Sequence, residues 1–316
     1  MKDLIKLKKN FNLFDFSYKS EYPQFPHNVI DFNLYNHKLK DVLDLRNNFL
    51  SSGISILRIN KKDPETICDE FKKIGNIFGK NPIRDATRRI TVKNNKDHDA
   101  LNSVDTGKFV GPHSETSFSP ARPSVIGFVC LDIDDTENNN GLTTIIDGSK
   151  IWKDLSMKTK SVFLSSNINY SLSIDTPSRK KIPKGKRDWY LEYNGVKNVQ
   201  LDGDKNKINF DFNVPFVTEH PIERFLTIAN HSFIYLKTEP QILKREINLS
   251  ISGSNEKELN DIKEDLHNAL DKNIFTFKWE KGLVLYLDNF RFMHGRLPYN
   301  LNLKRKLYIS QLKNYV

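Results

Sequence analysis

Short apolar segments separated by turn residues constrain the fold of this chain more than any other feature. Residues 54–59, 124–132, 143–146, 283–287 and 306–312 are segments of this kind. Apolar or alternating runs of this length, bounded by turn signals, are typical of β-strands. Helical patterns are fewer, so the sequence predicts a mainly β, α+β fold of the β-sandwich or jelly-roll type.

A smaller number of segments has the pattern of helices. The clearest is 255–272, where Leu259, Ile262, Leu266 and Leu270 recur at helical spacing between charged residues. A second helix is predicted to begin after the N-cap Asp63 and to run to about residue 75. Shorter helices are expected over 40–49 and after residue 147. Residues 94–108 are predicted to be a loop, and 134–141 a hairpin loop joining the strands on either side.

One stretch combines a histidine and an acid two residues apart, Gly111-Pro112-His113-Ser114-Glu115. Residues i and i+2 of a β-strand point to the same side, so His113 and Glu115 are expected to aim a nitrogen and an oxygen at one point. The best candidate for a third ligand is His294. Two histidines and one carboxylate with the remaining positions open suit a non-haem Fe(II) oxygenase.

A His-x-Glu triplet is common by chance, and alone it more often carries no metal. Three further patches supply context. They are Asn140-Gly141-Leu142-Thr143-Thr144, the segment from His220-Pro221 to Asn230, and the segment from Trp279 to Arg305 that contains Asp288-Asn289 and His294-Gly295-Arg296. In this order, these patches and the triplet resemble the TauD/TfdA family of Fe(II)- and 2-oxoglutarate-dependent dioxygenases, from about Arg84 to Leu312.

The resemblance implies a double-stranded β-helix, a distorted jelly roll with helices packed on one outer face. It implies Fe(II) as cofactor, with 2-oxoglutarate and O2 as co-substrates. The resemblance also implies that the catalytic and metal-binding residues are His113, Glu115 and His294. Arg305 lies eleven residues after His294, which is the family's spacing for the arginine that binds the distal carboxylate of 2-oxoglutarate.

Three nearby side chains complete the expected surroundings of the metal. The Thr143 hydroxyl is predicted to contact 2-oxoglutarate, with Thr144 as the alternative because a one-residue shift reverses the face of a strand. Arg296 is expected either to orient the co-substrate or the substrate, or to form a structural salt bridge. His231 is expected to be a hydrogen-bonded structural histidine rather than a ligand.

Two departures from the family pattern matter. Many members have Asp where this chain has Glu115, which places the chain nearer the clavaminate synthase-like branch. Related halogenases hold a halide in place of this carboxylate, so Glu115 favours hydroxylation, desaturation or cyclisation. The other departure is Asn140, where a first glycine is usual. Asparagine tolerates the left-handed backbone better than most residues.

The expected substrate is a small molecule, amino-acid-like or another carboxylate, either free or bound to a carrier protein. The 94–108 loop and a lid-like insert at about 165–215, with Arg187, Trp189 and Tyr190, are predicted to recognise it. The competing interpretation is that these residues only pack the insert onto the sheet. The alternative function is a non-catalytic binding protein that retains the fold. The intact set of metal and co-substrate residues weighs against that alternative.

The remaining features describe the chain as a whole. No linker or repeat divides its 316 residues, so one domain over 1–316 is expected. The net charge is +10, but lysines are scattered, which favours a solvated surface over a nucleic-acid partner. No apolar stretch approaches the ~20 residues that span a bilayer. The N-terminus lacks a secretory pattern, and Cys68 and Cys130 lie in apolar surroundings, so a cytoplasmic location is expected. The sequence does not indicate an oligomeric state.

Overall fold

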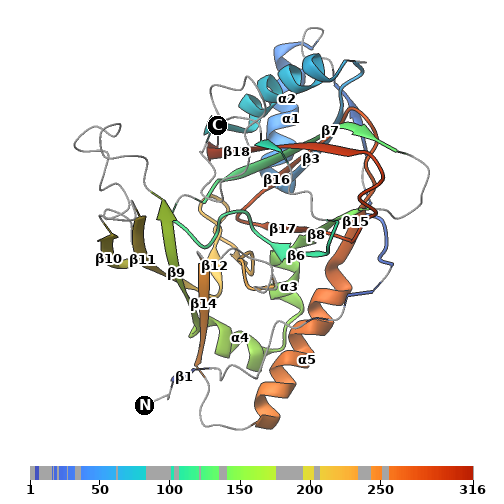
Figure 1. The fold of residues 1–316 in the computed structure, drawn as a ribbon. Helices are drawn as coiled ribbons and strands as arrows, with labels where there is room; N and C mark the ends of the chain where they lie inside the picture. The colour runs from blue at the N-terminus through green and yellow to red at the C-terminus, as the bar shows by residue number, and fades with distance from the viewer. Residues whose placement is uncertain are drawn as a thin grey trace.

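Two facing β-sheets form the centre of the molecule (Figure 1). The computed structural model describes residues 4–6, 16, 18–19, 21–26, 28–32, 37–61, 63–82, 101–102, 107–120, 122–134, 141–175, 195–202, 207–233, 243–250 and 256–315. Among these residues strands predominate and five helices occur, which confirms the mainly β, jelly-roll-like architecture.

The larger sheet has seven strands. Along the sheet they are β2 (Ile30–Asp31), β3 (Ile54–Arg58), β16 (Leu283–Asp288), β7 (Val125–Ile133), β18 (Arg305–Tyr315) and β4 (Gly79–Pro82), with β5 (Leu101–Asn102) also pairing with β18. All neighbours are antiparallel except β2 and β3. Segments from both ends of the chain therefore share one sheet.

The smaller sheet has four antiparallel strands. In order they are β15 (Ile274–Phe277), β8 (Thr143–Asp147), β17 (Phe292–Arg296) and β6 (Val110–His113). The hairpin predicted for 134–141 is wrong, because β7 and β8 belong to different sheets and do not pair. The connection crosses between sheets, although residues 135–140 lie outside the described part of the chain.

Apolar side chains fill the space between the two sheets. The larger sheet contributes Ile126, Phe128 and Leu285, and the smaller sheet contributes Ile145 and Phe277, all buried in one cluster. Burying such side chains stabilises a fold by roughly 1.5–3 kcal/mol each. This shared core fixes the distance between the sheets and thus the walls of any site between them.

Helices cover both outer faces, so the expectation of helices on one face is wrong. Next to the larger sheet lie α1 (Leu39–Ser52) and α2 (Pro64–Phe78), which bury Phe49 and Phe71 against it. Next to the smaller sheet lie α3 (Gly148–Asp154), α4 (Met157–Leu164) and α5 (Glu256–Asn273). Outward-facing Ile146 and Met293 of the smaller sheet belong to their core cluster.

The helix boundaries follow local capping chemistry. Asp63 accepts hydrogen bonds from the backbone N–H groups of Glu65 and Thr66, with Pro64 as the first helical residue of α2, as predicted. Asp147 caps α3 by accepting from Ser149 N. The helix predicted over 255–272 is α5, in which Ile262, Leu266 and Leu270 are buried.

A third sheet contains the described strands of the predicted insert at 165–215. Its order is β1 (Leu4–Lys6), β14 (Leu243–Ser250), β9 (Asn167–Asp175), β11 (Lys207–Pro215) and β10 (Val196–Asp202). A short pair, β12 (Thr218–Glu219) with β13 (Leu226–Thr227), lies nearby. Arg187, Trp189, Tyr190 and Asn140 lie outside the described residues, as does most of the predicted 94–108 loop.

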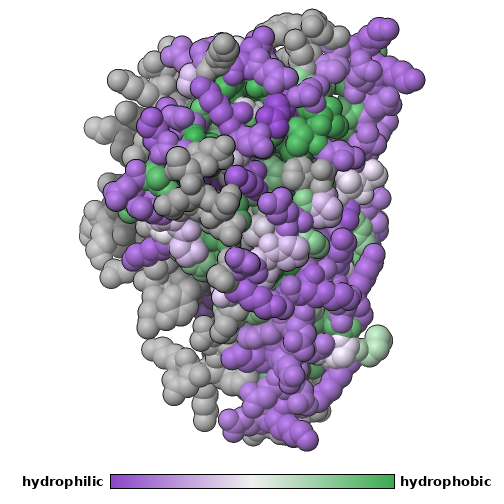
Figure 2. Space-filling view, turned by 90° about the vertical axis from the view of Figure 1, so that its right-hand side faces the viewer, coloured by the Kyte–Doolittle hydropathy of each residue, from purple (hydrophilic) through white to green (hydrophobic). Residues whose placement is uncertain are grey.

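One face of the molecule is mostly polar (Figure 2), and the two cysteines are buried. Figure 2 shows one face that is mostly hydrophilic, with apolar side chains gathered in its upper part. Among the described residues, none of the helices combines the length and apolarity needed to cross a bilayer. Cys68 and Cys130 are both buried thiols that form no disulfide, as predicted. Burial raises the pKa of Cys130 to about 12.

Candidate metal centre

His113 and His294 are brought together by strand pairing. His113 ends β6, His294 lies in the middle of β17, and the two residues are directly opposite in the antiparallel register. Opposite residues in such a pair project to the same face of the sheet, and the two ring centroids are 4.4 Å apart. Both side chains are buried, with about 7% of each residue exposed.

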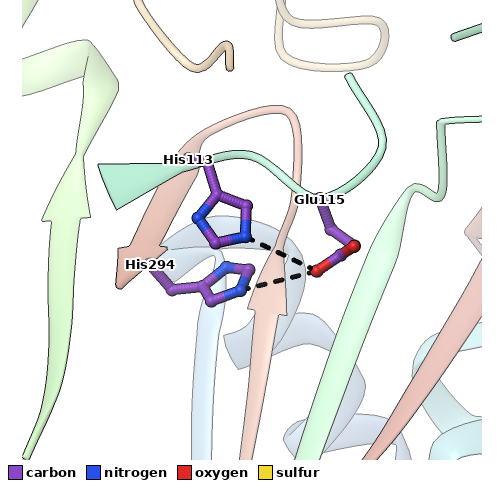
Figure 3. A group of neighbouring side chains, drawn as sticks. All are labelled: His113, Glu115 and His294. Carbon is purple, nitrogen blue, oxygen red and sulfur yellow. Dashed lines mark ion pairs between the residues drawn. The ribbon is translucent and has the colours of Figure 1, made fainter. Parts of the chain in front are cut away.

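Glu115 reaches the same point by a different route from the one predicted. Strand β6 ends at His113, and Glu115 lies in the turn that follows. The same-face argument for a strand therefore does not apply to this residue. The turn nevertheless directs the carboxylate toward both imidazoles (Figure 3). Its buried Oε2 lies 3.7 Å from His113 Nε2 and 3.6 Å from His294 Nε2.

These separations fit a shared metal ion better than direct hydrogen bonds. They exceed the usual ~3.2 Å limit for hydrogen bonds, whereas ligands bound to one ion by ~2 Å bonds lie roughly 3 to 4 Å apart. One ligand atom from each residue lies within 4.8 Å of the others. His113 Nδ1 donates a hydrogen bond to the Gly111 carbonyl, 2.9 Å away. Because a carbonyl only accepts, this bond leaves the Nε2 lone pair of His113 for a metal.

A cavity opens beside the three side chains. It is lined by Val110, His113, Glu115, Phe128, Thr143, His294, Gly295, Arg296, Arg305, Leu307 and Ile309. Thr143 lies opposite Arg296 in the register of β8 and β17, so both project to the cavity face. Thr143 Oγ1 accepts a hydrogen bond from Trp279 Nε1 at 2.8 Å.

Thr144 is on the other face of β8. Its Oγ1 is so close to Gly295 that a Cβ added there would lie 2.6 Å away. Only glycine fits at position 295, next to His294. Of the two threonines that the sequence left open, the structure thus puts Thr143 at the cavity.

Two arginines flank the ring of Tyr299 at the cavity wall. The guanidinium carbons of Arg296 and Arg305 lie 4.7 Å and 5.4 Å from its centroid. Arg296 also donates from Nη2 to the Lys108 carbonyl, and Arg305 from Nε to the Gly141 carbonyl. Gly141 has φ +66°, so this glycine adopts the left-handed backbone in the described part of the patch. Two cations at one cavity favour an anionic occupant.

His231 lies near the site but outside the ligand group. Its ring centroid is 5.4 Å from that of His113, and the described residues that gather as possible ligands are His113, Glu115 and His294. Burial, and after it the nearby His113, hold the pKa of His231 well below its usual value. The expectation of a structural role for His231 agrees with this arrangement.

A buried polar network beside the site was not predicted from the sequence. His220 Nε2 donates to Asp288 Oδ2 at 2.7 Å, and Tyr315 Oη donates to Asp288 Oδ1 at 2.7 Å. Backbone N–H groups of Ile222 and Glu223 point at His220 Nδ1, which fixes the proton on Nε2. His220 and Asp288 each stood in a recognised patch, but a contact over 68 residues of sequence has no local signal.

The comparisons with known proteins agree with this geometry. A family model described as "Taurine catabolism dioxygenase TauD, TfdA family" matches residues 21–310. The chain therefore belongs to the TauD/TfdA family, and it is an oxidoreductase of the dioxygenase class that uses Fe(II), 2-oxoglutarate and O2. No curated protein sequence gives a significant match.

Solved structures show the same fold at low sequence identity. A taurine dioxygenase from Burkholderia xenovorans has a TM-score of 0.55 and 16% identity, over 92% of this chain and 88% of that one. The PvcB protein from Pseudomonas aeruginosa has a TM-score of 0.52 and 14% identity, over 86% of this chain and 79% of that one. Another structure of PvcB is described as an Fe, alpha-ketoglutarate dependent oxygenase from an isonitrile synthetic pathway.

Proposed function

We propose that His113, Glu115 and His294 bind Fe(II) and that this centre oxidises an unactivated C–H bond of a small substrate. The observation that carries the proposal is the convergence of His113 Nε2, His294 Nε2 and Glu115 Oε2 in one buried cavity. When bound, iron and 2-oxoglutarate supply the oxidation: O2 is consumed, 2-oxoglutarate becomes succinate and CO2, and hydroxylation leaves one oxygen atom on the substrate.

Arg305 is the proposed partner of the distal carboxylate of 2-oxoglutarate. Its planar guanidinium matches a carboxylate with two parallel hydrogen bonds, and it lines the same cavity as the iron ligands. The Thr143 hydroxyl, held by Trp279, can offer the same carboxylate a further bond. Arg296 is the second cation of the wall and orients either the co-substrate or the substrate.

The apolar side chains of the cavity limit access of water. Phe128 packs edge-on against the His294 ring, with centroids 4.9 Å apart, and Leu307 and Ile309 of β18 line the same wall. An apolar wall that excludes water protects a reactive centre from side reactions. These residues therefore confine the oxidation to a substrate held in the cavity.

The substrate proposed is amino-acid-like or another small carboxylate, free or attached to a carrier protein. The support is Glu115, which is typical of the clavaminate synthase-like branch, and the cationic character of the cavity wall. The proposal treats 1–316 as one dioxygenase domain, with a lid-like insert at about 165–215. The single-domain interpretation is supported by the larger sheet, because β2 and β3 from the N-terminal part of the chain lie in the same sheet as β18 from the C-terminal part.

A structure of the protein with Fe(II) and 2-oxoglutarate under anaerobic conditions tests this proposal. The expected result is metal density among His113, Glu115 and His294, with the distal carboxylate at Arg305. Metal bound elsewhere, or a co-substrate carboxylate at another cation, would contradict the assignment.

A further inference from the structure

The turn that carries Glu115 lacks the support that a strand would give. β6 ends two residues earlier, and the next residue, Thr116, has φ +54°. A non-glycine residue rarely adopts this left-handed backbone, and it persists only where surrounding contacts hold it. A ligand on such a turn keeps its position only if other groups fix its backbone.

Asn289 fixes the Glu115 backbone from both sides. Glu115 N donates to Asn289 Oδ1 at 2.8 Å, and Asn289 Nδ2 donates to the Glu115 carbonyl at 2.9 Å. A side-chain amide thus replaces the N–H and C=O of a neighbouring strand. The second hydrogen on Nδ2 is donated to the Pro123 carbonyl, 2.9 Å away. The Ser114 hydroxyl lies 3.0 Å from Oδ1 and shares its single hydrogen between this oxygen and the Asn289 backbone carbonyl. Asn289 is fully buried.

Asn289 is itself attached to the larger sheet. It follows β16 directly, and its backbone N–H donates to the Ser124 carbonyl at 2.9 Å. Its own carbonyl accepts from Ser114 Oγ and from Arg122 Nη2, each at 2.6 Å. The Asp288 network with His220 and Tyr315 holds the preceding residue. The amide therefore transmits the position of a rigid sheet to the turn.

We propose that Asn289 is a positioning residue for the Glu115 ligand and thereby sets the metal affinity of the site. The inference rests on the proposed function, in which Glu115 binds iron. His113 and His294 are placed by their strands, so the carboxylate is the ligand that most needs outside support. Groups that orient metal ligands typically change metal affinity by roughly 10- to 100-fold when they are removed.

The test measures Co(II) binding, an oxygen-stable probe of the iron site, in the full-length protein. Asn289→Ala is expected to raise the Co(II) dissociation constant by roughly 10- to 100-fold and to alter the Co(II) absorption spectrum. Asn289→Asp has the same shape but offers no donor to the Glu115 carbonyl, so it is also expected to weaken binding. The matched control is Asn273→Ala, which removes a buried amide with two hydrogen bonds on α5.

A second readout needs no metal. The backbone amide of Glu115 is expected to exchange its hydrogen faster in Asn289→Ala than in the wild type, and to be unchanged in Asn273→Ala. If Asn289 only contributes stability, both alanine variants will lower the melting temperature and both will retain wild-type Co(II) affinity and spectrum. That result would overturn the positioning role of Asn289 but would not contradict iron binding by His113, Glu115 and His294. A wild-type protein that binds no Co(II) overturns the proposed function itself.

Discussion

His113 and His294 face each other across a single pair of antiparallel strands, with ring centroids 4.4 Å apart. Two of the three proposed metal ligands are therefore positioned by sheet register, and the third, Glu115, by a turn outside the sheet. Strand β17 pairs along its length with β8, and β6 pairs with β17 at two positions with an irregularity between them. The two histidines are therefore expected to be robust and the carboxylate sensitive to local change.

Removing any of the three ligands is expected to weaken metal binding. His294→Ala leaves one imidazole and one carboxylate, and the dissociation constant for Fe(II) should rise by about a hundredfold or more, in line with the loss of a few kcal/mol. Anaerobic titration measures it. His267→Ala, a half-buried histidine of α5, is the control and should bind Fe(II) normally. Equal affinity in His294→Ala would remove this residue from the site.

Arg305→Ala is expected to raise the KM for 2-oxoglutarate by about a hundredfold, because losing one partner of a buried charge pair costs a few kcal/mol. Fe(II) affinity should change little. Arg305→Lys should recover part of the loss, since it keeps the charge but lacks the two-pronged geometry. If the KM is unchanged in Arg305→Ala and raised in Arg296→Ala, Arg296 is the residue that binds the co-substrate.

Oxidation without halogen incorporation is expected from the wild-type protein. As a metal ligand, Glu115 would fill the position where related halogenases hold a halide, so added chloride or bromide should not change the product mass pattern. Glu115→Ala should lose hydroxylation whichever halide is supplied. Mass spectrometry of the products checks both results, and a chlorinated product from the wild type would contradict this prediction.

Stability is expected to fall as the pH rises above 9. Burial raises the pKa of Cys130 from 9.0 to about 12 and that of Tyr170 from 10.0 to about 12. A raised folded-state pKa gives stability that is complete below the unfolded pKa and is lost toward the folded one. Urea unfolding at pH 8 to 10.5 measures it. Cys130→Ala should flatten the pH dependence, and an equally steep decline in that variant would show that burial of this thiol is not the cause.

Local chemistry made much of the fold predictable. The Asp63 cap and Pro64 marked the start of α2, and apolar spacing marked α5 and the central strands β7, β16 and β18, because these signals lie within a few residues of one another. The hairpin at 134–141 failed for the opposite reason. Whether two consecutive strands pair or cross between sheets depends on distant neighbours, in this fold β16, β18, β15 and β17.

For the candidate site too, local features were predictable from the sequence and long-range contacts were not. The residue types and order pointed to His113, Glu115 and His294, and the structure puts their ligand atoms within 4.8 Å of one another. The strand argument for Glu115 was wrong, since a turn carries this residue. Asn289 stood in one of the quoted patches, but its contact with the turn, over 174 residues of sequence, has no local signal.

Succinate formation tests the central claim most directly. The purified protein, supplied with Fe(II), 2-oxoglutarate and O2, is expected to form succinate, slowly without substrate and faster when a substrate is present. Glu115→Ala and His294→Ala should reduce succinate to the level of a protein-free control, whereas His267→Ala should match the wild type. Succinate formed equally by the wild type and the two ligand variants, or by none of them, would contradict an iron oxygenase centred on His113, Glu115 and His294.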